Sequence, residues 1–155
     1  MPSAAVSPQS WTHFSDVAFN FELDPPTPAK VREWVSELFQ NQHISLAIAL
    51  AEAGLALYPD SEDVLVIAAL VSEVQQDWPR SRELLEHLIQ VQNGNTPADV
   101  WYHLARVLRC QGQLERSRAV VLQALRKHPS STDLQQLAAE LDEVFLKSVN
   151  SVPGT

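Results

Sequence analysis

An internal repeat constrains this sequence more than any other feature. Three segments, which begin at Ala47, Ser81 and Ser117, can be laid over one another. Each starts with a small residue and has apolar residues four and seven places further on, and the starting residues are 34 and 36 positions apart. Self-similarity with a period of about 34 residues is the signature of a helix–turn–helix array. The spacing therefore predicts a chain built from stacked helix pairs.

The composition is that of a single folded domain. Hydrophobic residues make up 45% of the 155 residues, which is enough to bury a core. No stretch approaches the roughly 20 apolar residues of a membrane helix, so we expect no membrane insertion. The first eight residues resemble no secretion signal, and the single cysteine, Cys110, cannot form an internal disulfide. These features favour a cytoplasmic protein.

The third copy contains Trp101, Leu104, Ala105, Leu108, Gly112, Ser117, Val121, Ala124 and Pro129. At this spacing these residues resemble a tetratricopeptide repeat almost position for position. The first copy departs from that motif at Gln42, where the family usually has its turn glycine, and the middle copy departs at Asn93, where a closing proline would stand. The resemblance covers roughly residues 28 to 131.

This resemblance implies an all-α fold, an α-solenoid of three antiparallel helix pairs that form a right-handed superhelix. Thr27 and Pro28 supply an N-cap and a first-turn proline for the first helix. We expect Trp34 and Trp101 to fill the space between helices. The repeats are expected at about 28–61, 62–97 and 98–131, with helices near 28–40, 43–57, 61–75, 79–91, 97–110 and 114–127.

A capping helix is expected over residues 131–148, because an open array leaves its last apolar face uncovered. Residues 28–149 would then form one domain, followed by a flexible tail over 150–155. The apolar stripe of the cap has the spacing of a helix with one buried face. It consists of Leu134, Leu137, Ala138, Leu141, Val144, Phe145 and Val149.

Residues 1–27 form a separate arm in this interpretation, irregular and punctuated by prolines. Aromatic residues at this density usually mark a segment that docks. Three destinations are open: the concave face of the solenoid, the exposed edge of the first repeat, or a second copy of the protein, which would give a homodimer by arm exchange. The anchors would be Trp11, Phe14, Phe19 and Phe21.

No catalytic chemistry is indicated by the sequence. No two of the five histidines have the helical spacing that would place both on one metal ion, and the four glycines form no phosphate loop. We therefore expect a protein that is not an enzyme and has no cofactor or metal. The net charge of −8 argues against nucleic acid as a partner.

The charge is unevenly distributed. Residues 97–129 contain six basic and two acidic residues, although the chain as a whole is acidic. This basic island predicts attraction of an acidic partner segment. The alternative is an ordinary solvated helical surface.

In the tetratricopeptide family the first helix of each pair lines a concave groove, so the resemblance also implies a binding surface. An apolar band in that groove, flanked by arginines, predicts a partner peptide or helix with apolar anchors and acidic residues. Some of these side chains could instead pack on the capping helix or the arm. The candidate partner-binding residues are Arg32, Ser36, Phe39, Val66, Leu70, Glu73, Tyr102, Arg106 and Arg109.

The function that these features favour is a non-catalytic protein–protein interaction module, a scaffold or adaptor. A dedicated chaperone for a bacterial secretion or assembly client is the alternative, since the secretion chaperones that resemble this chain are also short, acidic and three-repeat proteins. The subfamily that holds the C-terminal carboxylate of chaperones is not expected, because Asp99 would repel a carboxylate. The corresponding places hold Arg32, Ser36, Ile67, Asp99 and His103.

Overall fold

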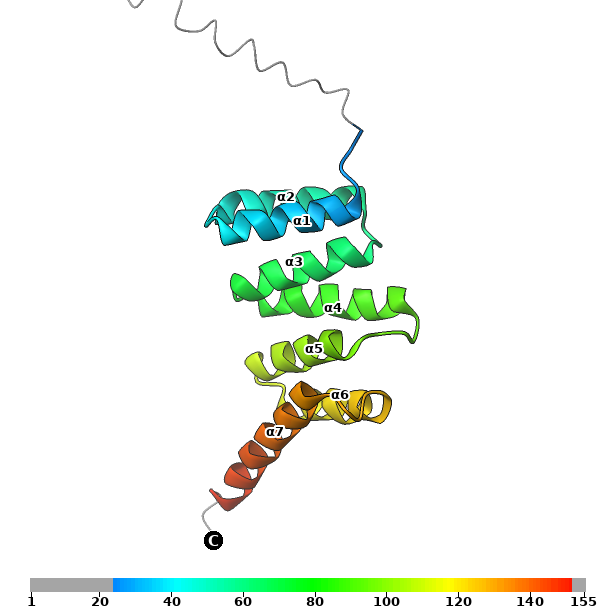
Figure 1. Ribbon diagram of the computed structural model, residues 1–155. Helices are drawn as coiled ribbons and strands as arrows, with labels where there is room; N and C mark the ends of the chain where they lie inside the picture. The colour runs from blue at the N-terminus through cyan, green and yellow to red at the C-terminus, as the bar shows by residue number, and fades with distance from the viewer. Residues whose placement is uncertain (1–23, 152–155) are drawn as a thin grey trace, which may run out of the picture.

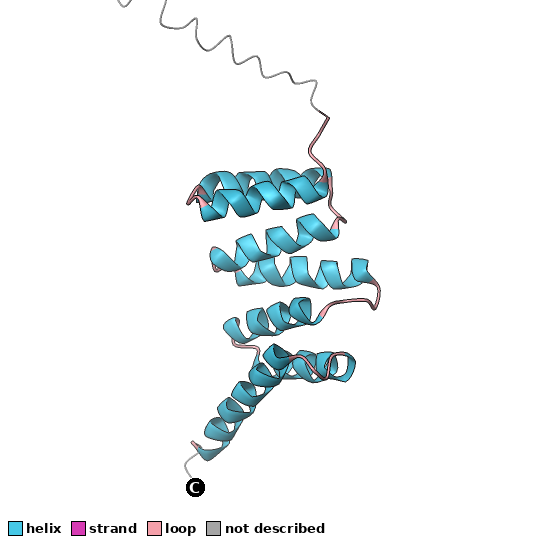
Figure 2. Ribbon diagram, viewed as in Figure 1, coloured by secondary structure: helices cyan, strands magenta, loops and turns pink. Residues whose placement is uncertain are grey.

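The computed structural model describes residues 24–151, and this part of the chain is helical without any strand (Figures 1 and 2). Successive helices pair and stack in a row, and the last helix closes the row at the C-terminal end. The predicted all-α solenoid is confirmed, and each predicted helix end lies within two residues of the observed one. The helices are α1 (Pro28–Gln40), α2 (Ile44–Leu57), α3 (Glu62–Val74), α4 (Trp78–Gln92), α5 (Ala98–Cys110), α6 (Leu114–Lys127) and α7 (Thr132–Asn150).

Side chains cap three of these helices in the way that local sequence chemistry requires. The side chain of Thr27 accepts a hydrogen bond from the Lys30 amide, and that of Ser131 accepts one from the Leu134 amide. Thr96 is of a residue type that commonly caps helices, but it precedes α5 without capping it. Pro97 is the N-cap of α5 instead, and it has an extended backbone without a side-chain cap bond.

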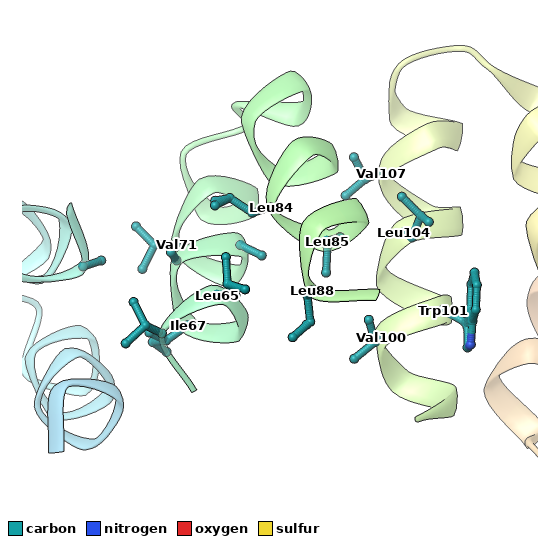
Figure 3. Packing of buried hydrophobic residues seen from close by; sticks show 14 of the residues in the cluster. Leu65, Ile67, Val71, Leu84, Leu85, Leu88, Val100, Trp101, Leu104 and Val107 are labelled. Carbon is teal, nitrogen blue, oxygen red and sulfur yellow. The ribbon is translucent and has the colours of Figure 1, made fainter. Parts of the chain in front are cut away.

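Small residues set the distance between paired helices, as the repeat pattern predicts. The side chains of Ala47, Ser81 and Ser117 are fully buried. The Ser117 hydroxyl donates to the carbonyl oxygen of Ala105 at 2.7 Å, which ties α6 directly to the backbone of α5. Leucines and valines from α3, α4 and α5 fill the space between the pairs (Figure 3).

The two tryptophans that were predicted to lie in the core differ in their burial. Trp101 is buried as predicted, but the prediction for Trp34 is wrong, because 39% of this residue remains exposed. Its equivalents in the second and third repeats, Ala68 and Leu104, are buried. Trp34 belongs to the first described helix pair, and no helix pair precedes it within residues 24–151.

The capping helix α7 packs on α5 and α6 through Leu134, Leu137 and Leu141, which are buried. The predicted stripe continues too far along this helix. Val149 is 71% exposed, because the C-terminal half of α7 extends beyond the body of the solenoid (Figure 1).

The turn between the helices of each pair contains one residue with a left-handed backbone. These residues are Gln42, Gln76 and Gly112, with φ values of 63°, 58° and 73°. They occupy the same place in the three repeats, and only the third is the glycine typical of this turn. A non-glycine residue is strained in this conformation.

We expect Gln76→Gly to raise the free energy of unfolding by about 0.5–1 kcal/mol, because glycine removes the steric cost of the left-handed backbone at a modest cost in chain entropy. Urea denaturation followed by circular dichroism measures the change. The reciprocal variant Gly112→Gln serves as the control and should be destabilised by a similar amount. A loss of stability in Gln76→Gly would show that the glutamine side chain contributes more than its strain costs.

Gly54 packs closely against α1, since an added Cβ would lie 2.7 Å from Cγ1 of Val31. We expect Gly54→Ala to lower the free energy of unfolding by about 1 kcal/mol, because overpacking outweighs the better helix propensity of alanine. In a Val31→Ala background the same substitution should become stabilising. A double-mutant cycle measured by urea denaturation tests this change of sign. If Gly54→Ala stabilised the parent protein, the expected overpacking against Val31 would be contradicted.

Candidate functional site

The nine candidate residues all lie on α1, α3 and α5, which are the first helices of the three pairs. Side-chain contacts show that these helices are neighbours in that order. Arg32 of α1 contacts Asp63 of α3 at 3.0 Å, and Glu73 of α3 contacts Arg106 of α5 at 3.6 Å. Three hollows open along this series of helices, and together we call them the groove.

The first hollow, of about 290 Å³, lies between α1 and α3 and is almost wholly apolar. Ser36 is the one polar side chain in its lining. The Ser36 hydroxyl already donates a hydrogen bond to the carbonyl oxygen of Arg32 at 2.9 Å. Val74, at its rim, is 63% exposed. We call it the apolar hollow; it is lined by Ser36, Phe39, Ile67, Leu70, Val71 and Val74.

The second hollow, of about 560 Å³, lies between α3 and α5; it has more acidic than basic side chains in its lining, and we call it the acidic hollow. Glu62, Asp63 and Asp99 contribute carboxylates to its lining. Each of them stands in the first turn of its helix, where a negative charge is stabilised by the helix dipole. Leu70 lines this hollow as well as the apolar one, so the two are contiguous.

The third hollow, of about 470 Å³, lies between α5 and α7 and contains Tyr102, Arg106 and Arg109. The candidate apolar band is therefore divided. Phe39 and Val66 share hollows with Leu70, whereas Tyr102 lines a separate hollow beside the capping helix. The ring of Tyr102 stands edge-on to that of His103, with the ring centroids 5.7 Å apart.

All three arginines of the candidate site already contact carboxylates of this chain. Arg32 pairs with Asp63, Arg106 with Glu73, and Arg109 with Glu140 of the capping helix. The hydrogen bond from Arg109, with a second from Gln136, lowers the pKa of the Glu140 carboxyl.

Most basic side chains of the island are paired with carboxylates in the same way. Four of its six basic side chains lie within salt-bridge distance of acids from neighbouring segments in residues 24–151. A charge count from the sequence does not include these acids, which the fold brings alongside the island. Attraction of an acidic partner segment to the island stays a prediction. Two of these contacts are made by α6, the second helix of the third pair. They join Arg116 to Glu86 and Arg118 to Asp142.

Glu73 is the most deeply placed of the candidate charged residues, with only 5% of its side chain exposed. One carboxylate oxygen lies 2.9 Å from Nδ1 of His103, and the other lies 3.6 Å from the Arg106 guanidinium. A buried carboxylate requires such partners to offset its desolvation. Glu73 therefore joins α3 to α5 within the wall of the groove.

Sequence reasoning missed some lining residues. Val74 and Ile67 line the apolar hollow, although neither was among the candidates. Both follow from the spacing, because Ile67, Leu70 and Val74 recur at the three- and four-residue intervals of one helix face. Gln136 and Glu140 reach the third hollow from α7, and no local signal points to them, since the placement of the capping helix brings them there.

The aromatic candidates of the arm, Trp11, Phe14, Phe19 and Phe21, lie outside the described residues. Within residues 24–151, no group of three or more His, Cys, Asp or Glu side chains could hold a metal ion. In the same part of the chain, none of the helices is both long and apolar enough to cross a membrane.

Comparison with known proteins agrees with this architecture. The family model described as tetratricopeptide repeat matches residues 98–141. No curated protein matches the chain in sequence. The match covers α5, α6 and the first half of α7, and the helix pairs of residues 28–127 have the architecture of tetratricopeptide-repeat structures.

Solved structures of the same fold are similar at low sequence identity. The TPR domain of Sgt2 from Aspergillus fumigatus has a TM-score of 0.71 at 12% identity, covering 87% of this chain and 89% of that one. The first TPR of Spaghetti (RPAP3), bound to the HSP90 peptide SRMEEVD, has a TM-score of 0.69 at 10% identity, covering 81% and 98%. MamA MSR-1 C2 has a TM-score of 0.69 at 15% identity, covering 92% and 79%.

Glu73→Ala should lower the free energy of unfolding by about 2–3 kcal/mol, because it leaves a cavity and removes the partner of two cationic or hydrogen-bonding groups. Urea denaturation measures the loss. The matched control is Glu86→Ala, whose exposed carboxylate also contacts two arginines and should contribute less than about 1 kcal/mol. Equal effects of the two substitutions would show that burial of Glu73 adds nothing to its contacts.

Proposed function

We propose that this protein is a non-catalytic interaction module of the cytoplasm, a scaffold or adaptor that binds a peptide or helix of another protein in the groove. The observation that carries the proposal is the apolar hollow, which places Phe39, Leu70 and Val74 at the surface between α1 and α3. Exposed apolar patches that polar residues surround usually mark interaction sites. An aliphatic or aromatic anchor of the partner would fill this hollow.

Peptide recognition by neighbours of the same fold supports the proposal. The first TPR of Spaghetti (RPAP3) binds the HSP90 peptide SRMEEVD, and the second TPR domain of human RPAP3 binds the HSP70 peptide SGPTIEEVD. A terminal carboxylate is disfavoured here, because Asp99 and Asp63 line the largest hollow and Arg32 is paired with Asp63. An internal segment of the partner fits these charges better.

Acidic residues of the partner would lie toward Arg106 and Arg109, at the C-terminal end of α5. Both guanidiniums contact one carboxylate each, and each retains a partly exposed side chain. A guanidinium has five N–H donors, so it can bind a further carboxylate. The partner would thus present an apolar anchor followed by acids, read from the α1–α3 hollow toward α5.

We expect Leu70→Asp to weaken partner binding by more than about 1 kcal/mol, because it places a charge between the apolar and acidic hollows. The partner is first identified by affinity capture and mass spectrometry, and binding of the purified pair is then measured by calorimetry. Leu122→Asp is the matched control, since Leu122 is an exposed leucine of α6 that lines none of the three hollows. Circular dichroism must show that both variants remain folded. If Leu70→Asp and Leu122→Asp bind alike, the groove is not the binding site.

A second measurement separates an adaptor from a dedicated chaperone, the alternative function. A chaperone keeps an otherwise insoluble client in solution in a one-to-one complex, whereas an adaptor binds a partner that is folded and soluble alone. Co-expression of the captured partner with and without this chain, followed by centrifugation, distinguishes the two. Partner solubility that does not change would favour the adaptor.

A further inference from the structure

An apolar stripe runs along the outer face of α2. Leu46, Leu50, Ala53 and Leu57 are spaced at intervals of four, three and four residues, which places them on one side of the helix. Leu46 is 59% exposed and Leu57 is 54% exposed. Together with Trp34 of α1 we call these residues the N-terminal edge.

The repeat register shows which way this stripe faces. The equivalent positions of α4 are Arg80, Leu84, His87 and Val91. Arg80 contacts Glu52 of the preceding pair at 3.7 Å, and His87 lies 2.8 Å from Asp60, which follows α2. Positions of this kind therefore contact the helix pair that comes before. The stripe of α2 therefore faces away from the rest of the solenoid, where no helix pair precedes α1 and α2 within the described residues.

The composition of the edge is unusual for the end of a solenoid, where the outer face is normally polar. The stripe has Leu46 and Ala53 where α4 has Arg80 and His87. The α1 half of the same end is more polar, since Trp34 is accompanied by Lys30 and by two glutamates. The uncovered apolar surface is thus a band along α2 with Trp34 beside it.

The chain that precedes α1 passes directly beside this band. The Tyr58 hydroxyl donates to the carbonyl oxygen of Pro26 at 2.9 Å, which ties the entry of the chain to the C-terminal end of α2, next to Leu57. From Leu57 to Leu46 the stripe is about 16 Å long at 1.5 Å per helical residue. Residues 11–23 can span about 40 Å when extended, more than enough to follow the stripe.

We propose that residues 11–23 of this chain cover the N-terminal edge, with their aromatic side chains against Leu46, Leu50, Leu57 and Trp34. The segment contains the apolar residues Trp11, Phe14, Phe19, Phe21 and Leu23. Their side chains would cover the exposed apolar surface of the N-terminal edge. This destination lies beside the point where the chain enters, because Pro26 is held at the C-terminal end of α2. The proposal does not depend on a partner in the groove.

Photo-crosslinking tests this arrangement in the full chain. Phe19 is replaced by p-benzoylphenylalanine, which keeps an aromatic ring at that position, and the crosslinked peptides are mapped by mass spectrometry. We expect crosslinks to α2 or to Trp34. Crosslinks to Phe39, Leu70 or Tyr102 would place the segment in the groove and overturn the proposal. The absence of any crosslink would also overturn it.

Mixing isotopically light and heavy protein separates contact within one molecule from exchange between two. We expect crosslinked peptides to be wholly light or wholly heavy. Mixed pairs would assign the segment to a second copy and overturn the proposal.

Substitution of the edge provides the second test. The double variant Leu46→Arg with Leu57→Lys introduces the residue types that α6 has at the equivalent positions, Arg116 and Lys127. We therefore expect the double variant to keep the fold, and circular dichroism checks this. The crosslinking yield should fall at least fivefold. The control Leu122→Arg adds a similar charge on α6 and should leave the yield unchanged. Equal yields in the parent and the double variant would contradict docking at the edge.

Discussion

The close approach of the two helices within each pair is the constraint on which the rest of this structure depends. It exists because Ala47, Ser81 and Ser117 occupy the same place in the three repeats and are fully buried. A larger side chain there would force the helices apart. Because α1, α3 and α5 are held in this way on their partners, they lie next to one another, and their exposed faces form the groove.

Polar contacts between the pairs set the chemistry of that groove. Glu73 joins α3 to α5, and Arg32 and Arg109 make further contacts with acids of the neighbouring helices. These ion pairs use carboxylates of the chain itself, so the groove is less basic than a count of arginines predicts. The apolar hollow between α1 and α3 contains no charged side chain, and this makes an apolar anchor the central element of the proposed recognition.

The helices could be predicted closely from the sequence, because their signals are local. Prolines and cap residues mark several helix ends, and three-and-four spacing marks the buried faces. The errors occur where a residue lacks the neighbours that its repeat equivalents have. Trp34 has the pattern of a core residue and is exposed at the edge, and Val149 continues an apolar stripe on a helix that has left the core. Tyr102 shares a helix face with other candidates but lines a different hollow.

The sequence by itself determined the repeat, the number of helix pairs and the small residues that let the helices of a pair approach, because a period of about 34 residues and a helical spacing depend only on order along the chain. Only the tertiary structure decided which charges are neutralised, where the groove divides, and which apolar face of the first pair is uncovered. These features depend on contacts between residues about 30 positions apart, such as Glu73 with His103, and their distances follow from how the pairs stack.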